Sequence, residues 1–428
     1  MIAAQVSSAD TAWMLGATAL VLLMTPALGL FYAGLVRSKN SLNTFMMSIA
    51  ALGLVTIAWA FVGYSLAFAH GNGFVGGLHH AFLHRVGYTA GDGRTIPDLL
   101  YMAYQATFCI ITAALVSGAV VERMRFTPYL VFIVLWSCLV YAPLAHWVWG
   151  GGWLAQRHVL DWAGGVPVEM ASGFSALAAA IAVGARADYG RRALLPHNSV
   201  LVLLGAGLLW FGWFGFNGGS AINAGNGAVL SFTNTLLAPA TTLVVWLVID
   251  HWRGGKPTAI GAATAIIVGC VVITPAAGWI SPMAAILLGA LGAIPSYAFI
   301  VWRPRTRLDE TLDVLAAHGL SGFFGLLFVG FFASAAWNGV QDGLLFGSPI
   351  QLGRQALAVA TGPVYAFAGT FVLMRAIAVF MPLRVSDRDE ALGLDITQHG
   401  EEAYAHGEGM ILISPEAGLE FERPVAQP

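Results

Sequence analysis

Long apolar segments alternate with short polar segments along almost the whole chain. A membrane-spanning α-helix needs about 20 mostly apolar residues, because each residue adds about 1.5 Å and the hydrocarbon core of a bilayer is about 30 Å thick. Eleven segments meet this requirement, at residues 11–35, 42–67, 98–121, 128–149, 163–184, 198–216, 228–250, 257–276, 281–301, 312–334 and 356–382. The pattern predicts an all-α membrane protein with eleven transmembrane helices in a domain at residues 1–382.

The composition supports the same fold class. Of the 428 residues, 58% are hydrophobic and only 10% are charged, whereas about 25% are charged in a typical soluble domain. Lysine and arginine form no run long enough for a phosphate-binding patch, so we expect no nucleic-acid partner. The three cysteines, Cys109, Cys138 and Cys270, lie in apolar stretches without CxxC spacing, which is typical of small buried apolar side chains.

The loops between the predicted helices differ in their basic residues. Alternate loops contain twelve of the twenty Lys and Arg residues, namely Arg37, Lys39, Arg123, Arg125, Arg186, Arg191, Arg192, Arg253, Lys256, Arg303, Arg305 and Arg307. The positive-inside rule places these loops in the cytoplasm. The N-terminus is then outside and the C-terminal tail inside, which requires an odd number of helices and agrees with eleven.

The helix count also predicts an internal symmetry. If the first ten helices form two groups of five, the second group begins on the opposite side of the membrane from the first, because five is odd. The two groups would then form a five-plus-five inverted repeat followed by one C-terminal helix.

The tail at residues 383–428 differs from the rest of the chain. It contains the polar strings DRDE at 387–390 and HGEEAY at 399–404, and no apolar run long enough to cross a membrane. It is interpreted either as a cytoplasmic docking or regulatory segment or as a solvated, frayed end.

Two ionisable residues lie deep inside predicted helices, where a charge is costly and therefore indicates a function. Asp161 marks the outer start of the fifth helix, and Glu169 lies about 12 Å deeper along it. His318 lies about 13 Å inward from Asp309, which is on the cytoplasmic side. Both residues fall near the midplane, on the last helix of each half. The pair predicts a substrate or proton site. The alternative is a structural hydrogen bond between two helices.

Most other charges lie at the ends of predicted helices. Glu122 and Arg123 are examples, and we expect them to reach the membrane surface.

Aromatic residues gather near the outer ends of several predicted helices. Phe108, Trp149 and the run WFGWFGFNGGSA, which contains Trp213, Phe216 and Ser220, are the main group. Most membrane aromatics form interfacial belts. Aromatic faces combined with a hydroxyl and a carboxylate also suit binding of a small cation through cation–π contacts.

Other chemistry is not supported by the sequence. The glycine-rich strings lack the GKS or GKT of a phosphate-binding loop, and Glu169 with His318 provides neither a Ser-His arrangement nor a HEXXH pair. We therefore expect no enzyme and no cofactor. His79, His80 and His84 lie in an outer loop and either bind a metal or, more simply, form part of a solvated loop.

Several strings, in order, resemble the motifs of the ammonium transporter family (Amt/Mep/Rh). They are PALGLFYAGLVRSKN at 26–40, YQATF at 104–108, AHWVWGGG at 145–152, LDWAGGVPVEMASG at 160–173, GWFGFNGGSA at 212–221, LDVLAAHG at 312–319 and GLDITQHGEEAY at 393–404. The resemblance covers nearly the whole chain. It implies a homotrimer in the cell (inner) membrane, with one pore for ammonium or ammonia in each subunit.

The resemblance also assigns roles at the outer end of the pore. Phe108, Trp149 and Ser220 would form the outer ammonium site, and Phe108 would stack on Phe216 as a hydrophobic gate below it. Asp161 would lie beneath that site and favour the cation, which is compatible with capping the fifth helix. Tyr104, where many bacterial relatives have Phe, would add a hydroxyl acceptor and an aromatic face.

Deeper in the pore the resemblance assigns Trp213 and Tyr32 to the wall and His318 to the second of the family's paired histidines. Glu169 departs from the family pattern, because most relatives have the first histidine at that position. Ammonium resembles potassium in size and charge, so a selective transporter is expected to remove a proton, pass neutral ammonia and move the proton separately. A midplane acid and imidazole suit the proton route.

A second function remains open. The same pore would serve an ammonium sensor that signals through its tail, and such a sensor would need an output domain or a partner. The resemblance to bacterial members also implies that a PII-type signalling protein binds the cytoplasmic tail.

Overall fold

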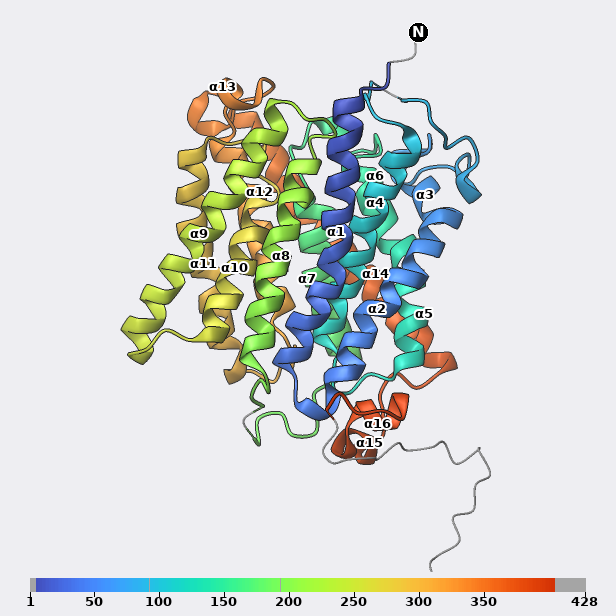
Figure 1. Ribbon diagram of the computed structural model, residues 1–428, viewed down its shortest axis with the longest axis vertical. Coiled ribbons are helices and arrows are strands. Elements are labelled where there is room, and N and C mark those ends of the chain that lie inside the picture. Colours follow the sequence, from blue (N-terminus) through green and yellow to red (C-terminus); the bar gives the residue numbers. More distant parts are fainter. Residues whose placement is uncertain (1–4, 92, 193, 405–428) are drawn as a thin grey trace, which may run out of the picture.

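The computed structural model of the chain describes residues 5–404 except 92 and 193. The described residues form a bundle of helices that run along one long axis (Figure 1) and contain no β-strand. The main helices are α1 (Ser8–Leu35), α2 (Ser41–Ala58), α3 (Tyr64–Phe68), α4 (Asp98–Val116), α5 (Phe126–Trp136), α6 (Ala142–Val148), α7 (Ala171–Val183), α8 (Ser199–Gly219), α9 (Asn226–Gly254), α10 (Ala259–Ile273), α11 (Pro282–Trp302), α12 (Ser321–Phe332) and α14 (Pro349–Phe380). Short helices are α13 (Ala335–Asn338), α15 (Asp387–Leu392) and α16 (Leu394–His399).

The predicted all-α membrane fold is confirmed. In the described part of the chain, ten helical segments are long and apolar enough to cross a membrane. The segment predicted at 257–276 is the shorter apolar helix α10, Ala259–Ile273. It ends early because Pro275 has no N–H to continue the helix. With α10 the number of crossings would be eleven, which stays a prediction.

The two ends of the described chain lie at opposite ends of the bundle. The start of α1 is at the top of Figure 1, and α15 and α16 are at the bottom. This arrangement agrees with an odd number of crossings. The outside position of the N-terminus still rests on the positive-inside rule.

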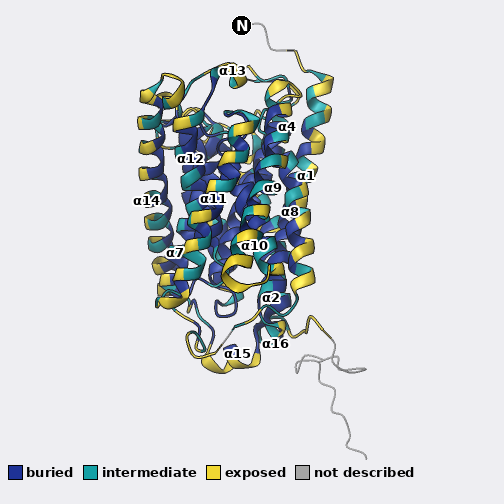
Figure 2. Cartoon of the chain, turned by 90° about the vertical axis from the view of Figure 1, so that its left-hand side faces the viewer, coloured by how far each residue is buried: buried dark blue, intermediate teal, exposed yellow. Residues whose placement is uncertain are grey.

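Large apolar side chains are exposed on the outer surface of the bundle. Figure 2 shows exposed and half-buried residues along outer helices such as α14, with buried residues between the helices. Val244 on α9 and Val372 on α14 are 61% and 67% exposed. A surface of this kind is expected to face lipid rather than water.

Two short π-helical segments form the starts of the helices that carry the two deep ionisable residues. They are η7 (Gly165–Met170), which leads into α7, and η9 (Leu315–Leu320), which leads into α12. Single-turn π segments inside α-helices occur frequently at functional sites. Glu169 lies on η7 and His318 on η9.

The starts of these two segments correspond to each other. Asp161 accepts hydrogen bonds from the backbone N–H groups of residues 164, 165 and 166. Glu310 accepts them from Val314 and Leu315. Each acid lies eight residues before Glu169 or His318, respectively (169 − 161 = 318 − 310). This correspondence supports the predicted inverted repeat.

Candidate functional site

Glu169 and His318 are in contact at the centre of the bundle. Nδ1 of His318 lies 2.8 Å from Oε2 of Glu169, and the two residues are 4% and 0% exposed. A neutral histidine can donate this hydrogen bond from Nδ1–H, or a protonated Glu169 can donate it to Nδ1. Either way the contact contains one proton that two ionisable groups can share.

Glycines allow the two helices to approach closely enough for this contact. A Cβ atom at Gly173 would lie 2.3 Å from Cα of Gly319, and one at Gly322 would lie 2.5 Å from Cβ of Glu169. Such separations are far below contact distance, so any side chain would push α7 and α12 apart. The glycines therefore fix the Glu169–His318 contact.

The predicted aromatic residues meet at the other end of the bundle from the tail. The rings of Phe108 and Trp149 are perpendicular, with centroids 6.0 Å apart. Ser220 Oγ donates to the carbonyl of Phe216 at 2.8 Å. Because its hydrogen is used in this bond, Ser220 presents lone pairs to the site and is an acceptor for a cationic donor.

Asp161 does not point its carboxylate freely into this site. Its two oxygens accept the three backbone hydrogen bonds that cap η7, and its carbonyl accepts one from Nε1 of Trp149 at 3.2 Å. The predicted capping role is therefore present. Burial raises the pKa of Asp161 to about 6, against the opposing effect of the backbone hydrogen bonds from Val166, Gly165 and Gly164.

A stacked pair of phenylalanines closes the passage below the aromatic site. The rings of Phe108 and Phe216 have centroids 4.0 Å apart and an interplanar angle of 24°. Both side chains are buried. The stacked rings lie directly between the aromatic site and the small cavity that Phe216 lines.

Tyr104 lies behind this pair and is fully buried. Its hydroxyl donates toward the carbonyls of Phe216, at 2.8 Å, and Gly215, at 3.1 Å. Its oxygen is 3.4 Å from Oγ of Ser220, and its ring packs against Phe108 with centroids 4.9 Å apart. The hydroxyl is thus used within the protein, and Tyr104 ties α4 to α8 at the gate.

Two cavities lie on the inner side of the gate. The first, of about 20 Å³, is lined by Phe216, Trp213, Tyr32, Glu169 and His318 and by apolar side chains. About 10–15 Å³ of such space holds one water, so this cavity fits one molecule of the size of water or ammonia. The Tyr32 hydroxyl donates to the carbonyl of Leu115 at 3.1 Å.

The second cavity, of about 580 Å³, extends from His318 to the loop at residues 189–196. Its wall includes Tyr32 and charged residues from several helices, among them Arg37 and Asp313. His318 lines both cavities and Glu169 only the small one. His318 therefore lies, with Phe31, Tyr32 and Ile267, where the small apolar cavity meets the wide inner cavity.

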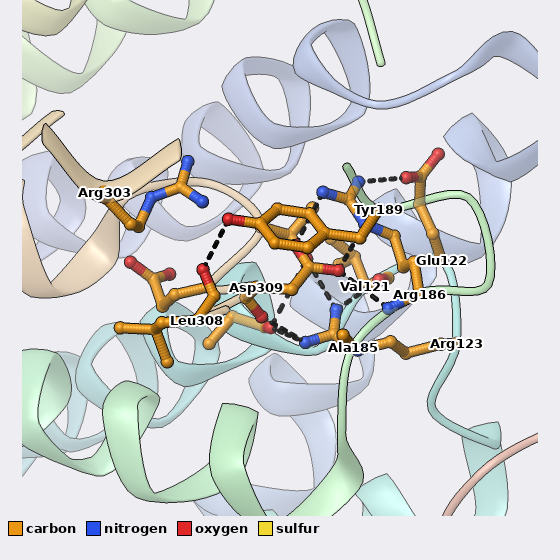
Figure 3. Close-up of polar contacts among 12 residues, drawn as sticks. Val121, Glu122, Arg123, Ala185, Arg186, Tyr189, Arg303, Leu308 and Asp309 are labelled. Carbon is orange, nitrogen blue, oxygen red and sulfur yellow. Dashed lines mark hydrogen bonds and ion pairs between the residues drawn. The ribbon is translucent and has the colours of Figure 1, made fainter. Parts of the chain in front are cut away.

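Charged residues in the wall of the second cavity form a network that the sequence did not predict. Figure 3 shows Arg186 between Glu122 and Asp309. Glu122 also pairs with Arg37 at 2.8 Å. Burial opposes ionisation of Glu122, but Arg186 and Arg37 outweigh it and keep the pKa of that carboxyl below its usual range.

Glu122 and Arg123, which are expected to reach the membrane surface, are covered by other parts of the protein. They are 1% and 0% exposed. Arg123 donates to the carbonyls of Gly184 and Asp309, at 2.6 and 2.7 Å, and to other backbone groups. Segments far along the chain cover these side chains, which the position of a residue at a helix end does not reveal.

The first part of the tail docks on the bundle. Asp395 accepts hydrogen bonds from the backbone N–H groups of Leu42 and Asn43, at the start of α2. The N–H of Leu394 donates to Oδ1 of Asn40, whose Nδ2 donates to Glu122. The described part of the tail is thus held by the bundle, and residues 405–428 of the predicted tail lie outside the described part.

The outer-loop histidines do not form a metal centre. His80 Nδ1 contacts the carbonyl of His84 at 3.1 Å. Among the described residues, no group of three His, Cys, Asp or Glu side chains is arranged to hold a metal ion.

Comparison with known proteins identifies the family. The model of the Ammonium Transporter Family matches residues 12–404. The chain belongs to the ammonium transporter family. It is 44% identical over 398 residues to the ammonium transporter of Bacillus subtilis (strain 168), covering 92% of this chain and 98% of that protein.

Solved structures of the family have the same fold. Mep2 of Candida albicans superposes with a TM-score of 0.86 at 35% identity, covering 93% of this chain and 91% of that chain. A structure described as a sensor Amt protein superposes with a TM-score of 0.85 at 28% identity, covering 91% of this chain and 98% of that chain. The fold is therefore shared by family members named as transporters and by one named as a sensor.

Proposed function

We propose that the chain is an ammonium transporter of the cell membrane that separates ammonium into ammonia and a proton. Ammonium is recruited between Phe108, Trp149 and Ser220, with the Tyr104 ring behind Phe108 and Asp161 beneath. The aromatic faces attract the cation, and the fixed acceptor of Ser220 takes a hydrogen bond from it. This proposal is supported by the ring geometry and by the direction of the Ser220 hydroxyl.

Ammonia then passes the Phe108–Phe216 gate alone. The cavity below the gate is apolar apart from a few groups and accommodates one small molecule. A bare cation would lose its hydration there without compensation, which costs many kcal/mol. The same cost excludes potassium, so the dry section provides the selectivity.

The proton follows a separate route through Glu169 and His318. Glu169 receives the proton, shares it with Nδ1 of His318, and His318 releases a proton from Nε2 into the wide inner cavity. Ammonia recombines with a proton in that cavity. The observation that carries the proposal is the 2.8 Å contact between two buried ionisable groups, of which only His318 lines the inner cavity.

Currents evoked by ammonium in proteoliposomes test this role. Wild type, Glu169→His and Glu169→Ala are compared with ammonium and with potassium. We expect Glu169→Ala to lose most of the current and Glu169→His, which restores the residue usual in relatives, to retain it. Full current with unchanged selectivity in Glu169→Ala would show that Glu169 is not on the proton route.

Assembly and regulation follow the family expectation. We propose a homotrimer and a tail at residues 383–428 that is available to a PII-type protein from the cytoplasm. Docking of residues 394 and 395 on α2 supports a tail with a defined surface. Size-exclusion chromatography with light scattering, and binding of a purified PII protein, test these two points.

The alternative is an ammonium sensor, which is favoured only by the likeness to the sensor Amt protein. Growth of a transport-deficient strain on low ammonium separates the two functions. A transporter restores growth, and a pure sensor does not.

A further inference from the structure

Thr274 lies at the end of α10 and is fully buried. Its Oγ1 accepts a hydrogen bond from Nε1 of Trp213 at 2.8 Å and donates one to the carbonyl of Cys270 at 2.8 Å. Trp213 lines the small cavity and packs against Phe216, with ring centroids 5.6 Å apart. The hydroxyl of Thr274 thus fixes the orientation of an indole at the pore wall.

The segment of Thr274 also packs against the segment of Glu169, because a Cβ atom at Gly165 would lie 2.7 Å from Cβ of Pro275. Trp213, which is bonded to Thr274, lines the same small cavity as Glu169. Oε1 of Glu169 has no hydrogen-bond partner among the described residues, although the side chain is completely buried. The backbone of Thr274 is also anchored, because its carbonyl accepts a hydrogen bond from Ala163 at 3.2 Å. Thr274 therefore bonds to the pore wall and to the loop below the outer site, next to the unpaired oxygen of Glu169.

A count of donors and acceptors shows what Thr274 can offer. A hydroxyl has one hydrogen and two acceptor positions. In this structure the hydrogen points to Cys270, and Trp213 uses one acceptor position. A neutral Glu169 can donate to the second position, and a charged Glu169 is stabilised when the hydrogen turns from Cys270 toward it.

We propose that Thr274 is a positioning residue for the pore, whose hydroxyl holds Trp213 in place and supplies the hydrogen bond that the charged form of Glu169 requires. The proposal rests on the proposed proton route and adds a residue to it. The carboxylate would otherwise be buried beside apolar side chains with only His318 as a donor, and an unsatisfied charge in such a place is costly.

Other ionisable groups face Glu169 from the elements around it. They are His318 on η9, Tyr32 on α1, Cys270 on α10 and Asp161 at the start of its own segment. The substitutions below leave these groups in place. Their contribution is therefore the same in each pair of proteins that is compared.

Infrared spectroscopy gives a direct test. The carboxyl band of Glu169, assigned by its loss in Glu169→His, is titrated in the purified protein and in Thr274→Val, which has the same shape without the hydroxyl. We expect the midpoint of the titration to move upward by about 0.5 pH unit or more, because the charged form loses a donor. Thr274→Ser, which restores the hydroxyl, should return the midpoint to the wild-type value.

An unchanged midpoint in Thr274→Val would overturn the proposal. Ammonium-evoked currents measured against pH provide the second readout. Thr274→Val should move the pH profile in the wild-type background and produce no such shift in the Glu169→His background. An equal shift in both backgrounds would show that Thr274 acts on Trp213 or on the fold, not on Glu169.

The failure of the two proposals can be distinguished. If Glu169→Ala keeps full current, the proton route is wrong, and the infrared titration still decides whether Thr274 bonds to Glu169. If Glu169→Ala loses current and Thr274→Val has the wild-type titration midpoint, the proton route stands and the role of Thr274 is wrong.

Discussion

Phe108 on α4 and Phe216 on α8 stack face to face, with ring centroids 4.0 Å apart, between the aromatic outer site and a cavity with room for one small molecule. The two rings come from helices more than one hundred residues apart in sequence. Their contact is the narrow point of the proposed route, so its removal has a direct consequence for selectivity.

Replacing Phe216 with alanine should weaken the gate. A stacked aromatic pair contributes about 1 kcal/mol beyond the area that it buries, which corresponds to roughly a fivefold change in an equilibrium. We expect the ratio of potassium to ammonium current to rise about fivefold or more in proteoliposomes. Phe214→Ala is the matched control, because the Phe214 ring packs against Phe232 with centroids 4.4 Å apart and does not line either cavity. Equal selectivity in the two variants would exclude the gate.

Replacing Ser220 with alanine should reduce recruitment without slowing saturated transport. A hydrogen bond to a charged group contributes about 1.5–3 kcal/mol, so the half-saturating ammonium concentration should rise about tenfold or more. The maximal current should change little, since the proposed proton route lies below the gate. Ser231→Ala is the control, because Ser231 makes the same bond to a helix carbonyl at 2.8 Å but lies on α9. A wild-type half-saturation value in Ser220→Ala would remove Ser220 from the site.

Asp161 should make ammonium recruitment depend on the outside pH. Burial raises its pKa to about 6, so it is charged above this pH and neutral below it. Because the charged form attracts the cation, the half-saturating concentration should increase as the outside pH falls through about 6. Asp161→Asn should show the higher value at every pH. A pH response in Asp161→Asn equal to that of the wild type would assign the dependence to another group.

The same raised pKa affects stability with the opposite sign from a salt-bridged acid. The folded state binds the proton of Asp161 more tightly than the unfolded state, in which the pKa of this carboxyl is 3.8. The contribution of Asp161 to stability therefore decreases as the pH rises from about 4 to about 6. Thermal unfolding in detergent at several pH values, compared between wild type and Asp161→Asn, measures this contribution of Asp161 to stability.

The length of apolar runs was sufficient to predict most of the fold. Each predicted span corresponds to a helix within a few residues, except that α14 begins at Pro349, seven residues before the predicted 356. The agreement follows because the bilayer fixes the length of its crossing segments. The depth of Glu169 and His318 followed from the same counting, since the rise per residue is constant. The contact between Glu169 and His318 also requires the glycines at 173, 319 and 322. The sequence shows these glycines but does not show which residues they pack against.

Contacts between distant segments were the part that could not be predicted. Thr274 lies in an apolar stretch and has no motif, and its partners Trp213 and Glu169 are on two other helices. Tyr104 was expected to offer its hydroxyl to the cation, whereas the hydroxyl bonds to the carbonyls of Phe216 and Gly215. The burial of Glu122 beneath Arg37 and Arg186 could not be predicted either, because a residue at a helix end gives no sign of the segments that cover it.

Arg186 should be the most sensitive residue of the cytoplasmic network. It is 8% exposed and bonds to Glu122 and Asp309, both buried. Removing one partner of a buried ion pair costs about 3–5 kcal/mol, because the remaining charges lose their counter-ion. We expect Arg186→Gln to lower the free energy of unfolding in detergent micelles by about this amount. Arg191→Gln, in the same loop but exposed, is the matched control.

The pH dependence of this loss follows from Glu122. Its pKa is held below the usual 4.5 by Arg186 and Arg37 against the effect of burial. The stabilisation by the charged Glu122 is therefore complete above about pH 4.5. It is lost as the pH falls through the lower pKa that Glu122 has in the folded state. The difference in unfolding free energy between wild type and Arg186→Gln should accordingly be large at pH 7 and shrink toward pH 3. A difference that is constant across this range would mean that Arg186 stabilises the loop through packing and not through its charge.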